Sequence, residues 1–371
     1  MEIPENSIAA QPELDQAVIA ILPPNCKVLS VTPLTDKHRG TIRTAKIVVQ
    51  PQHGHDVNAI AEYFIKTASG PAGAEMMRSA FEADHALYKF LSAHVPQPIG
   101  WGTYSSTPSE SHTHFYLSEF VAMRDDSDDH HSLRPGVDGP RAWACALAGL
   151  HRNSMGNTPA GRRGMFGFHV DTYIVDVPMD NAWTDSWEGF WARQMRGLFA
   201  REEEQRLAGD GDGAGGEENK VDDEFEELKR RYFEEAVPRY LRPLESEGRQ
   251  VEACLIHSDL YPGNVKPRAS PEGGLWVYNA CAFWGHNEAD LGVCRIPRYK
   301  LGQACIDEYL MRVPVSEPEE DFDGRNAVYA MKYHVLLSSM YPRDANFRRV
   351  LVEELRALVE MVEADKTVAH W

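Results

Sequence analysis

One stretch of the chain places an aspartate and an asparagine on either side of a Pro-Gly turn, and it reads LIHSDLYPGNV over residues 255–265. Asp259 precedes Asn264 by five residues. The apolar residues at both ends of the stretch predict two short buried strands that hold the loop between them. Taken alone, the same spacing also arises in a polar turn at a strand end, where an Asp or Asn side chain bonds the nearby backbone.

Kinase catalytic loops carry an Asp and an Asn at the same interval. In those loops the Asp accepts the proton of the acceptor hydroxyl or orients it, and the Asn binds a magnesium ion on the phosphates. We therefore interpret Asp259 as the catalytic residue and Asn264 as a metal ligand.

Two segments resemble a known family in detail. Residues 257–264 (HSDLYPGN) resemble the H-G-D-L-x-x-G-N loop of the fructosamine kinases and their aminoglycoside kinase relatives. Residues 284–291 (WGHNEADL) resemble the G-H-x-E-A-D-L signature of the fructosamine kinases. Leu150-His151 and Phe166–Phe168 agree with the same family in the same order, so that the resemblance covers roughly residues 25–365.

The resemblance implies an α+β, bilobed protein-kinase-like fold. Residues 1–120 would form a small antiparallel-sheet lobe that binds the nucleotide, and residues 121–371 a larger helical lobe that carries the catalytic loop. The implied activity is the ATP-dependent phosphorylation of a hydroxyl group, with magnesium as cofactor. The acceptor would be a sugar-derived amine, either a glycated protein lysine or a small molecule.

The pattern of apolar residues agrees with a strand-rich first third and a helical remainder. It predicts strands at 43–49, 60–67 and 115–121, and helices at 13–22, 76–91 and near 351–362. The stretch 209–219 (GDGDGAGGEEN) holds no residue that can form a core. We therefore interpret residues 207–220 as a flexible acidic insertion between two helices.

The resemblance also implies a nucleotide site in the first lobe. Lys66 follows Phe64 and Ile65 on a predicted strand, in the place of the family's phosphate-binding lysine, and Glu82 lies 16 residues later on the next helix. A Lys-Glu ion pair would hold the ammonium toward the α and β phosphates. An exposed strand lysine and a solvated helix face are the structural alternatives. Glu119 and Val121 would form the hinge whose backbone meets adenine.

One metal-binding position departs from the family pattern. The family carries an Asp about fifteen residues after the catalytic-loop Asn, but this chain reads VYNACAFW over residues 277–284 and has Asn279 there. An amide offers magnesium a neutral oxygen in place of a carboxylate. Residues 33–41, in the place of the phosphate-covering loop, hold one glycine, and Ser258 replaces the usual Gly of the catalytic loop.

Two classes of function therefore compete. The first is a kinase that phosphorylates a sugar-derived amine, and Lys66, Glu82, Asp259, Asn264 and Glu288 favour it. The second is a pseudokinase or a repurposed kinase fold, which binds a nucleotide or metabolite without phosphoryl transfer or supports different chemistry in the same cleft. The altered metal position and the glycine-poor loop favour the second class.

Four residues of the helical part are candidates for an acceptor pocket. They are Trp187, Trp284, His286 and Glu288. Buried packing within a helical lobe is the structural alternative for the tryptophans.

The composition of the chain argues against several classes of binding partner. The formal net charge of -18 disfavours binding to nucleic acid or to an anionic membrane. The six cysteines are dispersed, without a pair at zinc-ligand spacing, and the chain begins without the basic and apolar run of a signal peptide. We expect a cytoplasmic monomer whose partners are a nucleotide and its acceptor.

Overall fold

The computed structural model describes residues 14–34, 42–52, 60–106, 112–124, 139–209, 217–270 and 273–368. The chain divides into two compact units. The first comprises Met1–His85 and Pro96–Ala122, and the second comprises Ala86–Val95 and Met123–Trp371. Most of the expected phosphate-covering loop, residues 35–41, lies outside the described residues.

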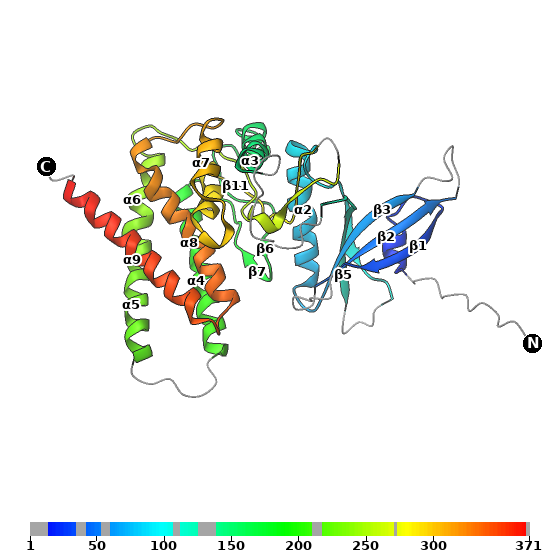
Figure 1. Ribbon diagram of the computed structural model, residues 1–371, viewed down its shortest axis with the longest axis horizontal. Coiled ribbons are helices and arrows are strands. Elements are labelled where there is room, and N and C mark those ends of the chain that lie inside the picture. The colour runs from blue at the N-terminus through cyan, green and yellow to red at the C-terminus, as the bar shows by residue number, and fades with distance from the viewer. Residues whose placement is uncertain are drawn as a thin grey trace, which may run out of the picture. The chain divides into compact units, whose positions relative to one another are not determined.

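The first unit is built around a five-stranded antiparallel sheet with the strand order β1-β2-β3-β5-β4 (Figure 1). Its strands are β1 (Cys26–Pro33), β2 (Arg43–Pro51), β3 (Ala61–Ser69), β4 (Pro98–Thr103) and β5 (Thr113–Glu119). Two helices accompany the sheet, α1 (Gln16–Ile19) and α2 (Gly73–Leu91). The part of α2 from Ala86 onward belongs to the second unit.

The two faces of this sheet have different side chains because successive residues of a strand point to opposite sides. Ile65 pairs with Leu117 across β3 and β5, and both are buried in a core that also contains Val18 of α1. The next pair, Lys66 and Tyr116, therefore lies on the other face. The alternation thus places a lysine and a tyrosine side by side on the face away from the α1 core.

The second unit is mainly helical. Its α-helices are α3 (Pro140–Ser154), α4 (Trp187–Gly209), α5 (Glu217–Arg231), α6 (Val237–Leu241), α7 (Gly302–Leu310), α8 (Phe322–Met340) and α9 (Ala345–Val368). Shorter helical segments are η1 (Tyr232–Ala236), η2 (Arg242–Glu245), η3 (Pro262–Asn264), η4 (Asn287–Arg295), η5 (Pro297–Tyr299) and η6 (Glu319–Asp321). Helix α8 packs against α4, α9 and η4, and α9 also runs beside α5 (Figure 1).

The described residues of the second unit also form six short strands. They are β6 (Thr172–Ile174), β7 (Val177–Met179), β8 (Cys254–Ile256), β9 (Val265–Pro267), β10 (Leu275–Val277) and β11 (Phe283–Gly285). Strand β8 pairs with β11, and β9 pairs with β10, in both cases antiparallel. The loop 257–264 therefore leaves one strand pair and enters the other, and the loop 278–282 returns in the opposite direction. This pairing brings the two loops together.

Most of the predicted elements are confirmed. Strands β2, β3 and β5 and helices α2 and α9 lie where the apolar pattern places them, and α1 is shorter than the predicted helix at 13–22. The pattern missed β4, whose sequence PIGWGT has two glycines and a proline, residues that are depleted in strands. Helices α4 and α5 reach further into the predicted insertion at 207–220 than expected, and residues 210–216 lie outside the described part of the chain.

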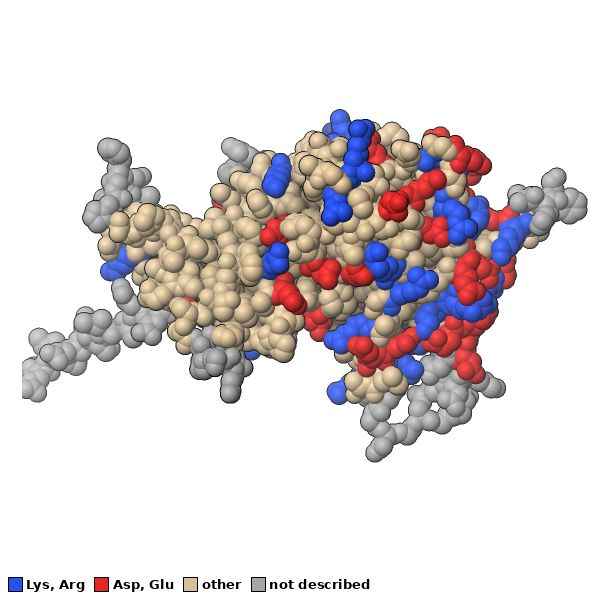
Figure 2. Space-filling view, turned by 180° about the vertical axis from the view of Figure 1, so that it is seen from behind, with Lys and Arg blue, Asp and Glu red and all other residues tan. Residues whose placement is uncertain are grey.

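Charged side chains on one face gather over the helical second unit (Figure 2). Basic and acidic side chains of α5 and α9 form ion pairs. Arg230 pairs with Glu227, and Arg356 pairs with Glu224. Such exposed pairs contribute little to stability because the solvent screens their charges. Among the helices that the structure describes, none is long and apolar enough to cross a membrane.

Candidate active site

The Asp and Asn of the quoted stretch contact each other directly. Asn264 Nδ2 donates to Asp259 Oδ2 and to the Asp259 carbonyl oxygen, both at 2.8 Å. The turn that brings them together is η3, in which the Asn264 amide N–H donates to the Tyr261 carbonyl at 2.9 Å. One side chain thus fixes both the backbone and the carboxylate of Asp259.

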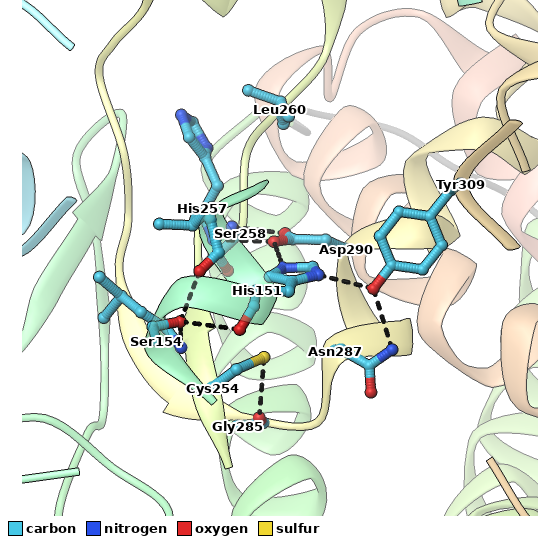
Figure 3. Close-up of polar contacts among 12 residues, drawn as sticks. His151, Ser154, Cys254, His257, Ser258, Leu260, Gly285, Asn287, Asp290 and Tyr309 are labelled. Carbon is cyan, nitrogen blue, oxygen red and sulfur yellow. Dashed lines mark hydrogen bonds and ion pairs between the residues drawn. The ribbon is translucent and has the colours of Figure 1, made fainter. Parts of the chain in front are cut away.

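A buried carboxylate anchors the start of the same loop. Asp290 of η4 accepts from the amide N–H groups of His257 at 2.8 Å and Ser258 at 2.6 Å. Figure 3 shows Asp290 between this backbone and the ring of His151 from α3. His151 Nε2 lies 3.1 Å from Asp290 Oδ2, and both side chains are fully buried. Asp290 therefore joins the catalytic loop, η4 and α3 at one point.

The polar network around Asp290 keeps it charged. Burial alone would raise the pKa of Asp290, but the hydrogen bond and charge of His151, with further contributions from His257, hold that pKa below its usual value. Tyr309 supports His151 from the other side, because its hydroxyl lies 2.7 Å from His151 Nδ1 and accepts from Asn287 Nδ2 at 2.9 Å (Figure 3). A buried charge that is paired and hydrogen-bonded in this way is stable in the interior.

The histidine of the catalytic loop is neutral at physiological pH. Burial lowers the pKa of His257 to about 4. Its Nδ1 atom accepts a hydrogen bond from the Asp259 amide N–H at 3.2 Å. His257 therefore holds the backbone of Asp259 and does not act as a cation beside it.

The altered position 279 lies against Asn264. Asn279 Nδ2 is 3.4 Å from Asn264 Oδ1. The backbone of Asn279 has a φ of 62°, a left-handed conformation that Asn and Asp adopt more readily than other side chains. The neighbouring Tyr278 joins the two loops, because its hydroxyl donates to the Gly263 carbonyl at 2.9 Å. An Asp at this position could adopt the same backbone conformation.

The side chains of these two loops offer oxygen atoms, which are the ligands that magnesium prefers. Most of these oxygens are neutral. Magnesium takes oxygen ligands, usually one or two carboxylates together with substrate phosphates. Asn264 and Asn279 supply neutral amide oxygens, and Asp259 supplies the nearby carboxylate, which already accepts from Asn264. These residues would therefore offer the ion one carboxylate and two neutral oxygens, and substrate phosphates would supply further negative charge.

In the first unit Lys66 lies near a buried carboxylate that is not Glu82. Burial lowers the pKa of Lys66, and the charge of Asp84 on α2 raises it. Tyr116 donates its hydroxyl to Asp84 Oδ2 at 2.9 Å, and burial, then the charge of Asp84, raises the pKa of Tyr116 well above its usual value. Lys66, Asp84 and Tyr116 thus form one polar cluster on a single face of the sheet.

The other residues predicted to bind the nucleotide lie on α2 and at the end of β5 or just after it. Glu82 is half-buried on α2, and its pairing with Lys66 stays a prediction. Glu119 ends β5, where its Oε2 atom accepts from the Gln97 amide at 3.2 Å, and Val121 is buried. Their contact with adenine stays a prediction.

The four candidates for the acceptor pocket are all buried. Trp187 is fully buried, and a Cβ atom on Gly285 would lie 2.7 Å from its ring, so Gly285 is needed for this packing. Trp284 packs edge-on against Phe90. Their contact with an acceptor stays a prediction that this burial counts against.

The polar candidates are also engaged with protein groups. Glu288 bonds Arg325 at 2.7 Å, with both side chains fully buried, and accepts from the Ser316 amide. His286 lies 2.8 Å from both the Tyr329 hydroxyl and Ser316 Oγ. A direct role for either in acceptor binding stays a prediction.

Sequence reasoning missed the roles of Asp84, His151 and Asp290. Asp84 carried a signal, because it falls on the apolar stripe of its helix, seven residues after Met77 and three before Leu87. A charge on an apolar stripe indicates a buried polar partner. His151 and Asp290 stand within segments that match the family, but nothing in the linear order shows that they meet across 139 residues.

Comparisons with known proteins show which family the chain belongs to. The sequence profile described as fructosamine kinase matches residues 29–346. The chain belongs to the fructosamine kinase family. A chloroplastic protein-ribulosamine 3-kinase of Oryza sativa subsp. indica is 25% identical over 274 residues, which span 74% of this chain and 66% of the relative, slightly less than two thirds of its length. The Arabidopsis thaliana protein of the same name is 24% identical over 276 residues, 74% of this chain and 69% of the relative.

Solved structures show the same fold. A proposed fructosamine-3-kinase of Thermobifida fusca has a TM-score of 0.61 at 20% identity and covers 90% of this chain and 94% of that one. An aminoglycoside phosphotransferase in a ternary complex with ADP and hygromycin B has a TM-score of 0.51 at 12% identity and covers 90% and 94%. The chain therefore has the α+β protein-kinase-like fold that its sequence predicts.

Proposed function

We propose that this chain is an ATP-dependent phosphotransferase that phosphorylates a hydroxyl group of a sugar-derived amine. The observation that carries the proposal is the catalytic loop, in which Asp259 is held by Asn264 at 2.8 Å and the preceding backbone is held by buried Asp290. Membership of the fructosamine kinase family supports the same reaction class. The names of the ribulosamine kinases support a ketosamine acceptor.

The residues of the site have separate roles in this reaction. Asp259 orients the acceptor hydroxyl and takes its proton as the hydroxyl oxygen bonds to the γ-phosphorus and the bond to ADP breaks. Asn264 keeps the Asp259 carboxylate in one orientation. Lys66, whose charge is supported by Asp84, offsets the negative charge of the α and β phosphates. Asn264 and Asn279 would hold a magnesium ion, which supplies positive charge at the phosphates.

A second function rests on one specific observation. Position 279 offers a neutral amide where a carboxylate would balance the metal charge, and that amide contacts Asn264. Binding of a nucleotide or metabolite without phosphoryl transfer would follow if the metal were too weakly held. The intact loop around Asp259 leads us to place phosphoryl transfer first.

Phosphorus NMR tests the proposal and the acceptor class together. The protein is incubated with ATP and magnesium and, in turn, with a fructose-derived lysine ketosamine, a ribose-derived lysine ketosamine, a glycated protein and an aminoglycoside. The proposal predicts a new phosphomonoester signal with at least one ketosamine. ADP formation without any acceptor signal, or no ATP consumption at all, would contradict it.

A further inference from the structure

A lysine lies buried directly behind the candidate catalytic loop. Lys332 of α8 is 2% exposed. Lysines are almost never this deeply buried unless they are paired. Its Nζ atom donates to the Ser258 carbonyl oxygen at 2.7 Å and also to Ser258 Oγ. Both acceptor atoms belong to the residue that immediately precedes Asp259.

Ser258 needs such support because of its backbone conformation. Its φ is 71°, in the left-handed region that side chains with a Cβ atom rarely adopt. Glycine would adopt this conformation without strain. In this chain the Ser258 amide is held by Asp290, while its carbonyl accepts from Lys332 and, at 3.3 Å, from the Tyr333 hydroxyl.

The packing of α8 on η4 fixes where these groups meet. A Cβ atom on Gly292 would lie 2.6 Å from the backbone of Tyr329, so that only glycine lets η4 lie this close to α8. Lys332 comes three residues after Tyr329, and Asp290 comes two residues before Gly292. The close approach of the two elements therefore brings Lys332 and Asp290 to the same residue from two sides.

Acidic groups around Lys332 oppose the effect of its burial. Burial lowers the pKa of Lys332 below its ordinary value, and the neighbouring Cys281, Asp259 and Asp290 counteract part of that shift. The ring centroid of Phe283 lies 5.9 Å from Nζ, within the range of a cation–π contact. The Lys332 side chain thus faces acidic groups that come from three places: the loop 257–264, the segment before β11, and η4.

We propose that Lys332 is a positioning residue, which together with Asp290 fixes Ser258 in its left-handed conformation and thereby sets the direction of Asp259. Lys332 would act through the carbonyl and hydroxyl oxygens of Ser258, the residue before Asp259. The catalytic consequence rests on the proposed phosphotransferase function. The effect on the loop itself does not depend on that function.

A double-mutant cycle with two readouts tests the proposal. The variants are Lys332→Met, Ser258→Gly and the two combined, with Met331→Leu as a packing control on the same helix. Amide hydrogen exchange of residues 257–264 reports the loop, and phosphoryl transfer reports catalysis. Lys332→Met should speed loop exchange about tenfold and lower kcat by as much as about a hundredfold, with little change in the KM for ATP.

The glycine background separates positioning from general packing. Because glycine holds the left-handed conformation unaided, Lys332→Met should cost much less in Ser258→Gly than in the parent, both in exchange and in kcat. Equal losses in the two backgrounds, or unchanged exchange in Lys332→Met, would overturn the proposal. If Lys332→Met does not fold, the proposal requires the double variant to fold, and an unfolded double variant also overturns it.

Failure of the proposed function can be told apart from failure of this inference. If the parent protein transfers no phosphoryl group, the proposed function is wrong, but the exchange cycle still decides whether Lys332 fixes the loop. If transfer occurs and the exchange cycle shows no dependence on Ser258, the inference alone is wrong.

Discussion

Asn279 Nδ2 lies 3.4 Å from Asn264 Oδ1, so the two side chains that the family resemblance assigns to magnesium contact each other. An Asp at position 279 would be compatible with the left-handed backbone and would add one negative charge. We therefore expect Asn279→Asp to strengthen ATP binding in the presence of magnesium roughly tenfold, about 1.4 kcal/mol. Calorimetric titration with ATP, with and without magnesium, measures this. Asn279→Ser is the matched control, because it shortens the side chain without adding charge.

Asp259→Asn is expected to abolish phosphoryl transfer. The amide cannot take the proton of the acceptor hydroxyl, and its NH₂ group would face Asn264 Nδ2 unless one of the two amides turned around. The midpoint of thermal unfolding should change little, because Asp259 lies at the edge of the buried network. Turnover of the variant at the parent rate would show that Asp259 is not the base.

The first unit offers a direct comparison of two carboxylates on one helix. Asp84 acts on Lys66 and accepts from Tyr116, whereas Glu82 lies about half a turn away. Asp84→Asn should therefore raise the KM for ATP more than Glu82→Gln does. Initial rates over a range of ATP concentrations measure both variants. A larger effect of Glu82→Gln would instead support the Lys66–Glu82 pair that the sequence suggests.

The local part of the site was predictable from sequence, and the long-range part was not. Asp259 and Asn264 are five residues apart, and a single turn brings them together, so their spacing carries the information. Lys332 reaches Ser258 across 74 residues through the packing of α8 on η4. No periodicity along α8 could show this, because nearly every residue of that helix is buried and its polar members are not confined to one side.

The fold was predictable for the same kind of reason. Strands β2, β3 and β5 and helix α2 each have the apolar period of their own class, so local pattern and tertiary structure agree. Strand β4 lacks that pattern and is defined by its pairing with β5. For the candidates of the acceptor pocket the sequence does not decide, because a buried tryptophan in a core and one in a pocket look alike in sequence.

The free energy of unfolding should fall at acid pH, because some histidines are buried in their neutral form. Burial, with the charge of Arg295, lowers the pKa of His334 to about 4, against about 6.5 in an unfolded chain. The unfolded state therefore binds more protons between these values, and the free energy of unfolding falls as pH drops from 6.5 toward 4. His334 alone contributes a slope of up to about 1.4 kcal/mol per pH unit.

Urea unfolding of His334→Leu across this pH range measures that contribution. The variant should show a flatter dependence than the parent, and the remaining slope should come in part from His257 and His286, whose pKa values burial also lowers to about 4. Identical slopes for the two proteins would mean that His334 is not held neutral in the folded state.

Glu288 is expected to act on stability through Arg325. Glu288→Gln would leave the Arg325 charge buried without its partner, and we expect the free energy of unfolding to fall by about 3–5 kcal/mol. Replacing both residues, as in Glu288→Leu with Arg325→Met, should cost less because no uncompensated charge remains. Chemical unfolding of the two variants compares them. A double variant less stable than Glu288→Gln would contradict this account of the pair.

The central claim is the proposal that this chain is a phosphotransferase in which Asn279, a neutral side chain, lies at the metal site. The most direct measurement is the rate of phosphoryl transfer from ATP to a ketosamine acceptor by the parent protein and by Asn279→Asp, at equal magnesium and with Asp259→Asn as the inactive reference. The account predicts measurable transfer by the parent and a rate at least about tenfold higher for Asn279→Asp. No transfer by either protein, with both folded and the ketosamine present, would contradict it.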